Sequence, residues 1–167
     1  MPITYFPDDT PASWAEIVLP YSPVFQATGL TFTGTGSNYP THGSYYVKSG
    51  KIVTFWAQVD LSTVTNFGTG QYKIALPVMP LQNALFHFTG WVWKDYTMPA
   101  DEEGNIVINA DHLANDQVLD LHFLVSATAN PKPVVEKQLT QSNLDLAHQM
   151  TVNSRIYVNG TYIASLT

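Results

Sequence analysis

Asp120 and His122 are the residues of this chain whose types and spacing come nearest to a metal-binding pattern. They lie two positions apart, so in a β-strand both side chains would project from the same face of the sheet. A carboxylate and an imidazole placed in this way can serve as two ligands of one ion. No His-x-His or His-Glu-x-x-His pair adds further ligands among the five histidines. A polar outer strand face accounts for the pair more simply, and we predict neither a metal nor a cofactor.

A second group of acids consists of Asp101, Glu102 and Glu103, to which Asp111 can be added. Calcium takes such oxygen ligands, but the chain has no calcium-binding loop of about twelve residues. Two carboxylates brought together by folding could also hydrolyse glycosidic bonds, because that chemistry requires only nearness in space. Nothing in the sequence points to such a pair, so the prediction is a solvated acidic loop.

The motifs of the common enzyme classes are absent. The chain has no Gly-x-Ser-x-Gly and no cysteine, which removes two frequent kinds of nucleophile. It has no Gly-x-x-x-x-Gly-Lys phosphate loop, and Gly34-Thr-Gly36 is too short for a dinucleotide fingerprint. We therefore expect a binding or structural protein and not an enzyme.

The charge of the chain argues against nucleic acid as a partner. Thirteen acids and seven bases give a net charge of -6, and no cluster of Lys and Arg offers the positive charge that phosphate contacts need. Charged residues make up 12% of the chain, about half of the usual share, so much of the surface is expected to be neutral, aromatic or covered by partners. No run approaches roughly 18 apolar residues, and Met1–Asp9 lacks the regions of a signal peptide. We expect neither a membrane span nor secretion.

The stretch 43–77 organises the fold through a two-residue alternation. Its central apolar residues, which fall at every second position, are Val53, Phe55, Ala57, Val59 and Leu61. This period is typical of a strand with one face in a core. A strand before it and another over 72–76 lie within about 35 residues without a helix between them, which indicates an antiparallel arrangement.

The same alternation recurs along the rest of the chain, over 30–34, 84–95, 106–109, 119–125 and 156–164. Asn159-Gly160 also fits a hairpin turn, but we prefer one continuous strand because the arms of that hairpin would be very short. Residues 134–150 fit no period and leave a short helix and an irregular excursion equally open. About eight strands predict an all-β fold, an antiparallel β-sandwich of the jelly-roll kind over 25–167, which must be held by packing without disulfides.

Residues 1–24 are predicted to form an extended N-terminal arm and a candidate attachment segment. Five prolines remove backbone donors there and favour extended structure, with room for a short pairing segment at Ala15–Leu19. Apolar side chains such as Tyr5, Phe6 and Trp14 must be buried against something. The arm either packs along its own domain or docks on a neighbouring subunit.

Several aromatic residues are predicted to face away from the core. In the strand over 84–95, Trp91 and Trp93 alternate with the core positions, and Trp56 does the same in the central strand. Tyr96 follows directly and joins them as a candidate. Several outward rings indicate a buried contact or a stacking surface, unless they only cover a second sheet of the same domain.

The order and spacing of these motifs resemble those of bacteriophage minor tail and tail-fibre head domains. The matching segments are Trp14…Tyr21-Ser-Pro23, Gly43-x-Tyr45-x-Val47-x-x-Gly50-x-x-Val53, Gly68-x-Gly70-x-Tyr72-x-Ile74-x-Leu76-Pro77 and Ile156-Tyr-Val-Asn-Gly-Thr-Tyr162. Residues 95–117 and 134–150 have no counterpart. The resemblance implies a jelly-roll domain that assembles as a homotrimer and binds host-surface glycans or decorates the particle.

Two functions follow as hypotheses. In the first, the chain is a non-enzymatic receptor-binding head in which Trp56, Trp91, Trp93 and Tyr96 stack on sugar rings. In the second, it is a structural component of capsid, tail or baseplate, the rings are buried between subunits, and the arm 1–24 holds a neighbour. In both, the resemblance implies a virion protein made in the host cytoplasm, whose partners are its own copies and other virion proteins.

Overall fold

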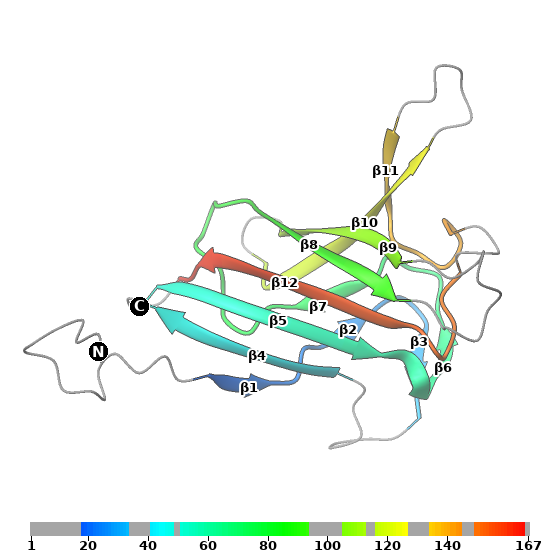
Figure 1. The fold of residues 1–167 in the computed structure, drawn as a ribbon, viewed down its shortest axis with the longest axis horizontal. Helices are drawn as coiled ribbons and strands as arrows, with labels where there is room; N and C mark the ends of the chain where they lie inside the picture. The colour runs from blue at the N-terminus through cyan, green and yellow to red at the C-terminus, as the bar shows by residue number, and fades with distance from the viewer. Residues whose placement is uncertain are drawn as a thin grey trace, which may run out of the picture.

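The computed structural model in Figure 1 is built almost entirely of β-strands. It describes residues 18–33, 41–48, 51–93, 105–112, 116–126, 134–144 and 149–165. Within these ranges the only helical element is the single 3-10 turn η3, Leu61–Thr63. No helix in these ranges has the length and apolar character needed to cross a membrane.

The strands pair antiparallel throughout. In chain order they are β1 Leu19–Tyr21, β2 Phe25–Gln26, β3 Leu30–Phe32, β4 Thr41–Lys48, β5 Ile52–Asp60, β6 Val64–Phe67, β7 Lys73–Ala75, β8 Phe86–Trp93, β9 Asn105–His112, β10 Val118–Ser126, β11 Val134–Gln138 and β12 Arg155–Ile163. The main sheet has the order β1-β4-β5-β12-β8-β9-β10-β7-β2, and β11 pairs with the second half of β10. Strands β3 and β6 form a separate two-stranded sheet.

The main sheet has to curl. Its two edge strands, β1 and β2, are separated by only three residues, 22–24, which can span on the order of 14 Å from one strand to the next. In a flat sheet the same strands would lie about 38 Å apart, since neighbouring strands are spaced by about 4.8 Å. The chain therefore brings both edges together, and β7 and β2 lie behind β5 and β12 (Figure 1). The predicted all-β, antiparallel, sandwich-like fold is confirmed, while the jelly-roll connectivity stays a prediction.

The core lies inside the curl, where the alternation places every second side chain. In β5 the odd positions are buried and the even ones face outward, as predicted. Strands β8 and β10 alternate in the same way, with the even-numbered Phe88 and Val92 and the odd-numbered Leu119 and Leu121 inside. The buried phenol of Tyr162 on β12 donates to the carbonyl of Val78 at 2.7 Å and accepts from its amide at 3.1 Å. This ring thereby fixes the loop between β7 and β8 against the core.

The predicted continuous strand across Asn159-Gly160 is confirmed. Strand β12 runs unbroken and pairs with β5 along its whole length and with β8 from Arg155 to Asn159. It is therefore the central strand of the front of the sheet (Figure 1).

Residues 134–150 contain a strand that the sequence did not indicate. Strand β11 pairs with β10, and the ends of the two project from the rest of the sheet (Figure 1). After β11 the chain turns irregularly and buries Leu139, Leu144 and Met150 in the core. Of the two alternatives for this segment, the irregular excursion is the correct one for 139–144 and 149–150.

The last part of the predicted arm belongs to the main sheet. Leu19–Tyr21 pairs with residues 43–45 of β4, so pairing begins at the residue where the predicted segment Ala15–Leu19 ends. Tyr5, Phe6 and Trp14 lie outside the described residues. The attachment role of 1–24 therefore stays a prediction.

Candidate functional site

The outer face of β5, β12 and β8 carries a group of aromatic side chains. We define the aromatic face as Trp56 on β5, Tyr157 on β12, and Trp91 and Trp93 on β8. Each lies at an outward position of the alternation, and Trp56 and Trp91 remain 45% and 39% exposed. Exposure of this extent is unusual for large indole rings and indicates a surface available to a partner.

Strand β12 lies between the strands that carry the three tryptophans. Tyr157 lies opposite Trp91 in the register, and the two rings stack at 5.2 Å between centroids with an interplanar angle of 20°. Trp56 lies on the other side of β12, opposite Asn159. Trp56 and Trp91 are offset by two strand spacings across the sheet and by two residues along it, which places them about 12 Å apart, so a ligand must extend across β12 to reach both.

Trp93 is held in a different way from Trp91. The guanidinium of Arg155 lies 5.6 Å from the centre of its ring, and the Nε of Arg155 donates to Asp60 at 3.1 Å. Burial alone would raise the pKa of the Asp60 carboxyl, but hydrogen bonds from Ser62 and Arg155 outweigh it and hold that pKa below its usual value. Asp60 therefore stays ionised and keeps Arg155 over the half-buried ring.

Neutral polar groups surround the aromatic face. Asn159 and Thr89 are exposed and lie opposite each other, and the hydroxyls of Thr54 and Thr161 are hydrogen-bonded at 2.8 Å. An open hollow of about 440 Å³ adjoins Trp56 and is lined also by Pro20, Tyr21, Ser22, Thr41 and Gly43. Rings beside amides and hydroxyls can bind a ligand that is apolar on one side and rich in hydroxyls at its edge.

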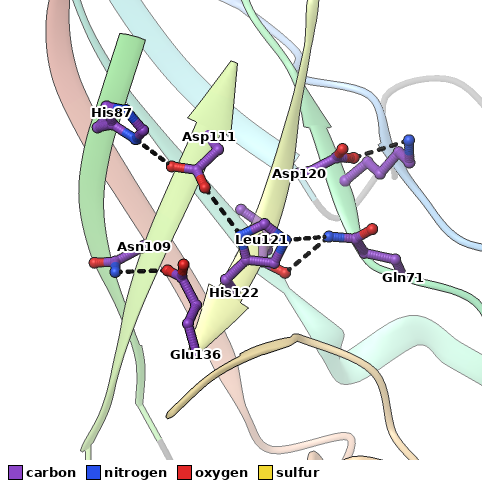
Figure 2. A network of polar contacts seen from close by, with 9 residues as sticks. Gln71, His87, Asn109, Asp111, Asp120, Leu121, His122 and Glu136 are labelled. Carbon is purple, nitrogen blue, oxygen red and sulfur yellow. Dashed lines mark hydrogen bonds and ion pairs between the residues drawn. The ribbon is translucent and has the colours of Figure 1, made fainter. Parts of the chain in front are cut away.

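A polar network occupies the outer face of β8, β9 and β10 (Figure 2). His87 contacts one oxygen of Asp111 at 2.6 Å, and His122 contacts the other at 3.0 Å. The second ring nitrogen of His122 lies 2.8 Å from the amide nitrogen of Gln71. Asn109 donates to Glu136 on β11 at 2.9 Å. Acidic and imidazole groups from four strands thus converge on one surface.

The network differs from the pairing that the spacing suggested. Asp120 and His122 do share one face of β10, but Asp120 binds Lys73 at 2.8 Å. The register places Asp120 opposite Asp111 and His122 opposite Asn109, so His122 reaches Asp111 diagonally. Neither this register nor the position of Glu136 could be predicted from the sequence, because β11 shows no clear alternation.

The remaining predicted site residues are Tyr96 and the four acids of the predicted loop. Tyr96 and the acids Asp101, Glu102 and Glu103 lie outside the described residues, whereas Asp111 lies in the middle of the sheet on β9. Tyr157 and Arg155 were not predicted as site residues. Their outward positions were visible in the alternation of 156–164, but their neighbours depend on where β12 inserts.

Comparison with family models, with curated proteins and with solved structures gives no match to this chain. The roles of the two candidate regions are therefore argued from the residues of this chain alone.

Proposed function

We propose that this chain is a receptor-binding head domain of a bacteriophage virion, which binds a host-surface glycan through the aromatic face and acts without catalysis. The observation that carries the proposal is the exposure of Trp56 and Trp91 on one face of the sheet. The order of motifs that resembles tail-fibre head domains supports the virion setting and the homotrimer.

The aromatic face suits a sugar chain for physical reasons. One side of a pyranose presents C–H groups that pack on an indole ring, while its hydroxyls point sideways towards hydrogen-bonding groups. Asn159 and Thr89 lie in the row that crosses β12 beside these rings. Because Trp56 and Trp91 lie about 12 Å apart, the expected ligand is an oligosaccharide and not a single sugar.

We expect Trp91→Ala to weaken glycan binding about 30-fold or more, the effect typical of an aromatic residue at the centre of an interface. The measurement is binding of the fluorescently labelled protein to host cells and to an array of their surface oligosaccharides. Trp56→Ala is expected to weaken binding to long oligosaccharides more than to short ones, since only long ones cross β12.

Leu85→Ala is the matched control, because Leu85 is a large apolar residue, 65% exposed, that lies before β8 and outside the aromatic face. It should bind as the unchanged protein does. Circular dichroism of each variant checks that the sheet is intact. Equal binding by Trp91→Ala and the unchanged protein, or no binding by either, would remove the receptor role.

A second candidate is a structural role with subunits packed against each other. It is favoured by an end patch, which we define as Ile52, Met79, Leu81 and Ile163, all 40–44% exposed. Ile163 lies opposite Ile52 in the register, and the segment 79–81 bonds to 163–165. A contiguous apolar patch of this kind is typical of a contact between proteins.

We expect Ile163→Glu to dissociate the homotrimer, because a charge would be buried in its contact. Light scattering at micromolar concentration measures the mass. Val152→Glu is the control, since Val152 is 43% exposed and lies just before the opposite end of β12. If Ile163→Glu remains a trimer, the end patch is not the contact between subunits. If the unchanged protein is a monomer, the homotrimer is ruled out.

A further inference from the structure

We propose that Asp111, His122 and Glu136 form a binding site for Zn²⁺, which we call the three-ligand cluster. Each residue offers one ligand atom, and the three atoms all lie within 4.8 Å of one another. They come from the neighbouring strands β9, β10 and β11. This site is separate from the aromatic face and does not depend on the proposed glycan binding.

The spacing of the ligand atoms is close to what zinc requires. In a tetrahedral site with bonds of about 2.0–2.1 Å, two ligand atoms lie about 3.3 Å apart. The Oδ2 of Asp111 and the Nδ1 of His122 are already 3.0 Å apart, and both side chains are about four-fifths buried. Glu136 is exposed, so its longer side chain can move the remaining distance. The sheet therefore holds Asp111 and His122 in position, and the side chain of Glu136 moves to complete the site.

Each of the three ligands is also contacted by a neighbouring polar side chain (Figure 2). His87 contacts the second oxygen of Asp111, Gln71 contacts the second nitrogen of His122, and Asn109 donates to Glu136. Metal ligands in proteins are commonly oriented by such outer partners. A plain solvated surface has no need of one partner for every ligand.

The hydrogen bonds of Gln71 assign the proton on His122. The amide nitrogen of Gln71 donates to the carbonyl of Leu121 at 3.3 Å and to Nε2 of His122 at 2.8 Å. In its neutral form the ring therefore carries its proton on Nδ1 and donates it to Asp111. Zn²⁺ bound at Nδ1 would require the other neutral tautomer: the ring proton would move from Nδ1 to Nε2, with no net release, and the Gln71 amide would turn so that its oxygen accepts from Nε2–H.

The chemistry of the ligands selects the ion. Calcium and magnesium prefer sites made of oxygen atoms, whereas an imidazole with two carboxylates suits Zn²⁺. Three protein ligands leave a fourth position of the tetrahedron for water or for a donor atom of a second molecule.

The test is calorimetric titration of the metal-free full chain, prepared without a histidine tag, with Zn²⁺. We expect one ion to bind per chain. Nitrogen NMR of the histidine rings should show Nδ1 of His122 shifting on addition of zinc, while the ring of buried His112 stays unchanged.

Glu136→Gln and Asp111→Asn should each weaken zinc binding about tenfold or more, since each removes a charged ligand. Glu136 is exposed, so its variant tests the site even if Asp111→Asn does not fold. Asp120→Asn is the matched control: the same charge is lost on the same face, from a residue that binds Lys73, and the affinity should change less than threefold or so. No binding by the unchanged chain, or binding that Glu136→Gln and Asp111→Asn leave intact, would overturn the proposal.

Discussion

Gly90→Ala is expected to destabilise the fold by about 3 kcal/mol or more, a large part of the roughly 5–15 kcal/mol that holds a typical domain together. Gly90 faces the core on β8, opposite Val158 of β12. A Cβ atom at this position would overlap the backbone carbonyl oxygen of Tyr157 and press on Ile108. Because the obstacle is the backbone of a paired strand, relief requires β8 and β12 to separate.

Two comparisons distinguish this effect from a general sensitivity of β8. Thr89→Ala changes the exposed neighbour and should cost no more than about 1 kcal/mol. Gly160→Ala would meet the ring of Phe88, a side chain that can shift, so its cost should lie between the two. Urea unfolding followed by tryptophan fluorescence gives the three values. A Gly90→Ala protein as stable as Thr89→Ala would contradict this account of the strand contact.

Raising the pH above 10 is expected to unfold the protein cooperatively. Burial raises the pKa of Tyr21, Tyr72 and Tyr162 well above the ordinary value near 10. These groups stay neutral in the folded state and ionise near pH 10 in the unfolded chain. Their contribution to stability is therefore complete below pH 10 and is lost as the pH rises further. Three such groups give a slope of up to about 4 kcal/mol per pH unit, so unfolding should occur between about pH 10 and 12.

Ultraviolet absorbance of tyrosinate and far-ultraviolet circular dichroism, recorded on the same samples, measure this transition. Ionisation of the buried tyrosines should coincide with loss of the β signal. Tyr72→Phe removes one of the three groups, together with its hydrogen bond to the carbonyl of Phe67, and should reduce the slope by about one third. Full ionisation of the tyrosines in a protein that keeps its β signal would refute the prediction.

The parts of the fold that the sequence predicted are those that depend on one strand at a time. Alternation identifies which face of a strand is apolar, and this was enough to predict the buried set of β5 and the outward direction of Trp56 and Trp91. It was also enough to prefer one continuous strand across Asn159-Gly160. These are local properties of successive side chains.

Contacts between strands could not be predicted in the same way. The stack of Trp91 on Tyr157 requires β12 to insert beside β8, and the contact between Asp111 and His122 requires one particular register of β9 and β10. Register is set by the packing of the whole core and by loops whose lengths do not reveal it. Glu136 was missed for a related reason, since the short strand β11 is defined by its partner more than by its own pattern.

The position of β12 has a consequence for how the protein is made. Among the described strands it comes last along the chain, yet it alone joins β1-β4-β5 to the opposite half of the sheet through hydrogen bonds. During synthesis β5 and β8 therefore each keep an unpaired edge until β12 has been made. Unpaired edges are templates for aggregation. A copy that lacks β12 would expose both edges, and we expect such copies to associate through them.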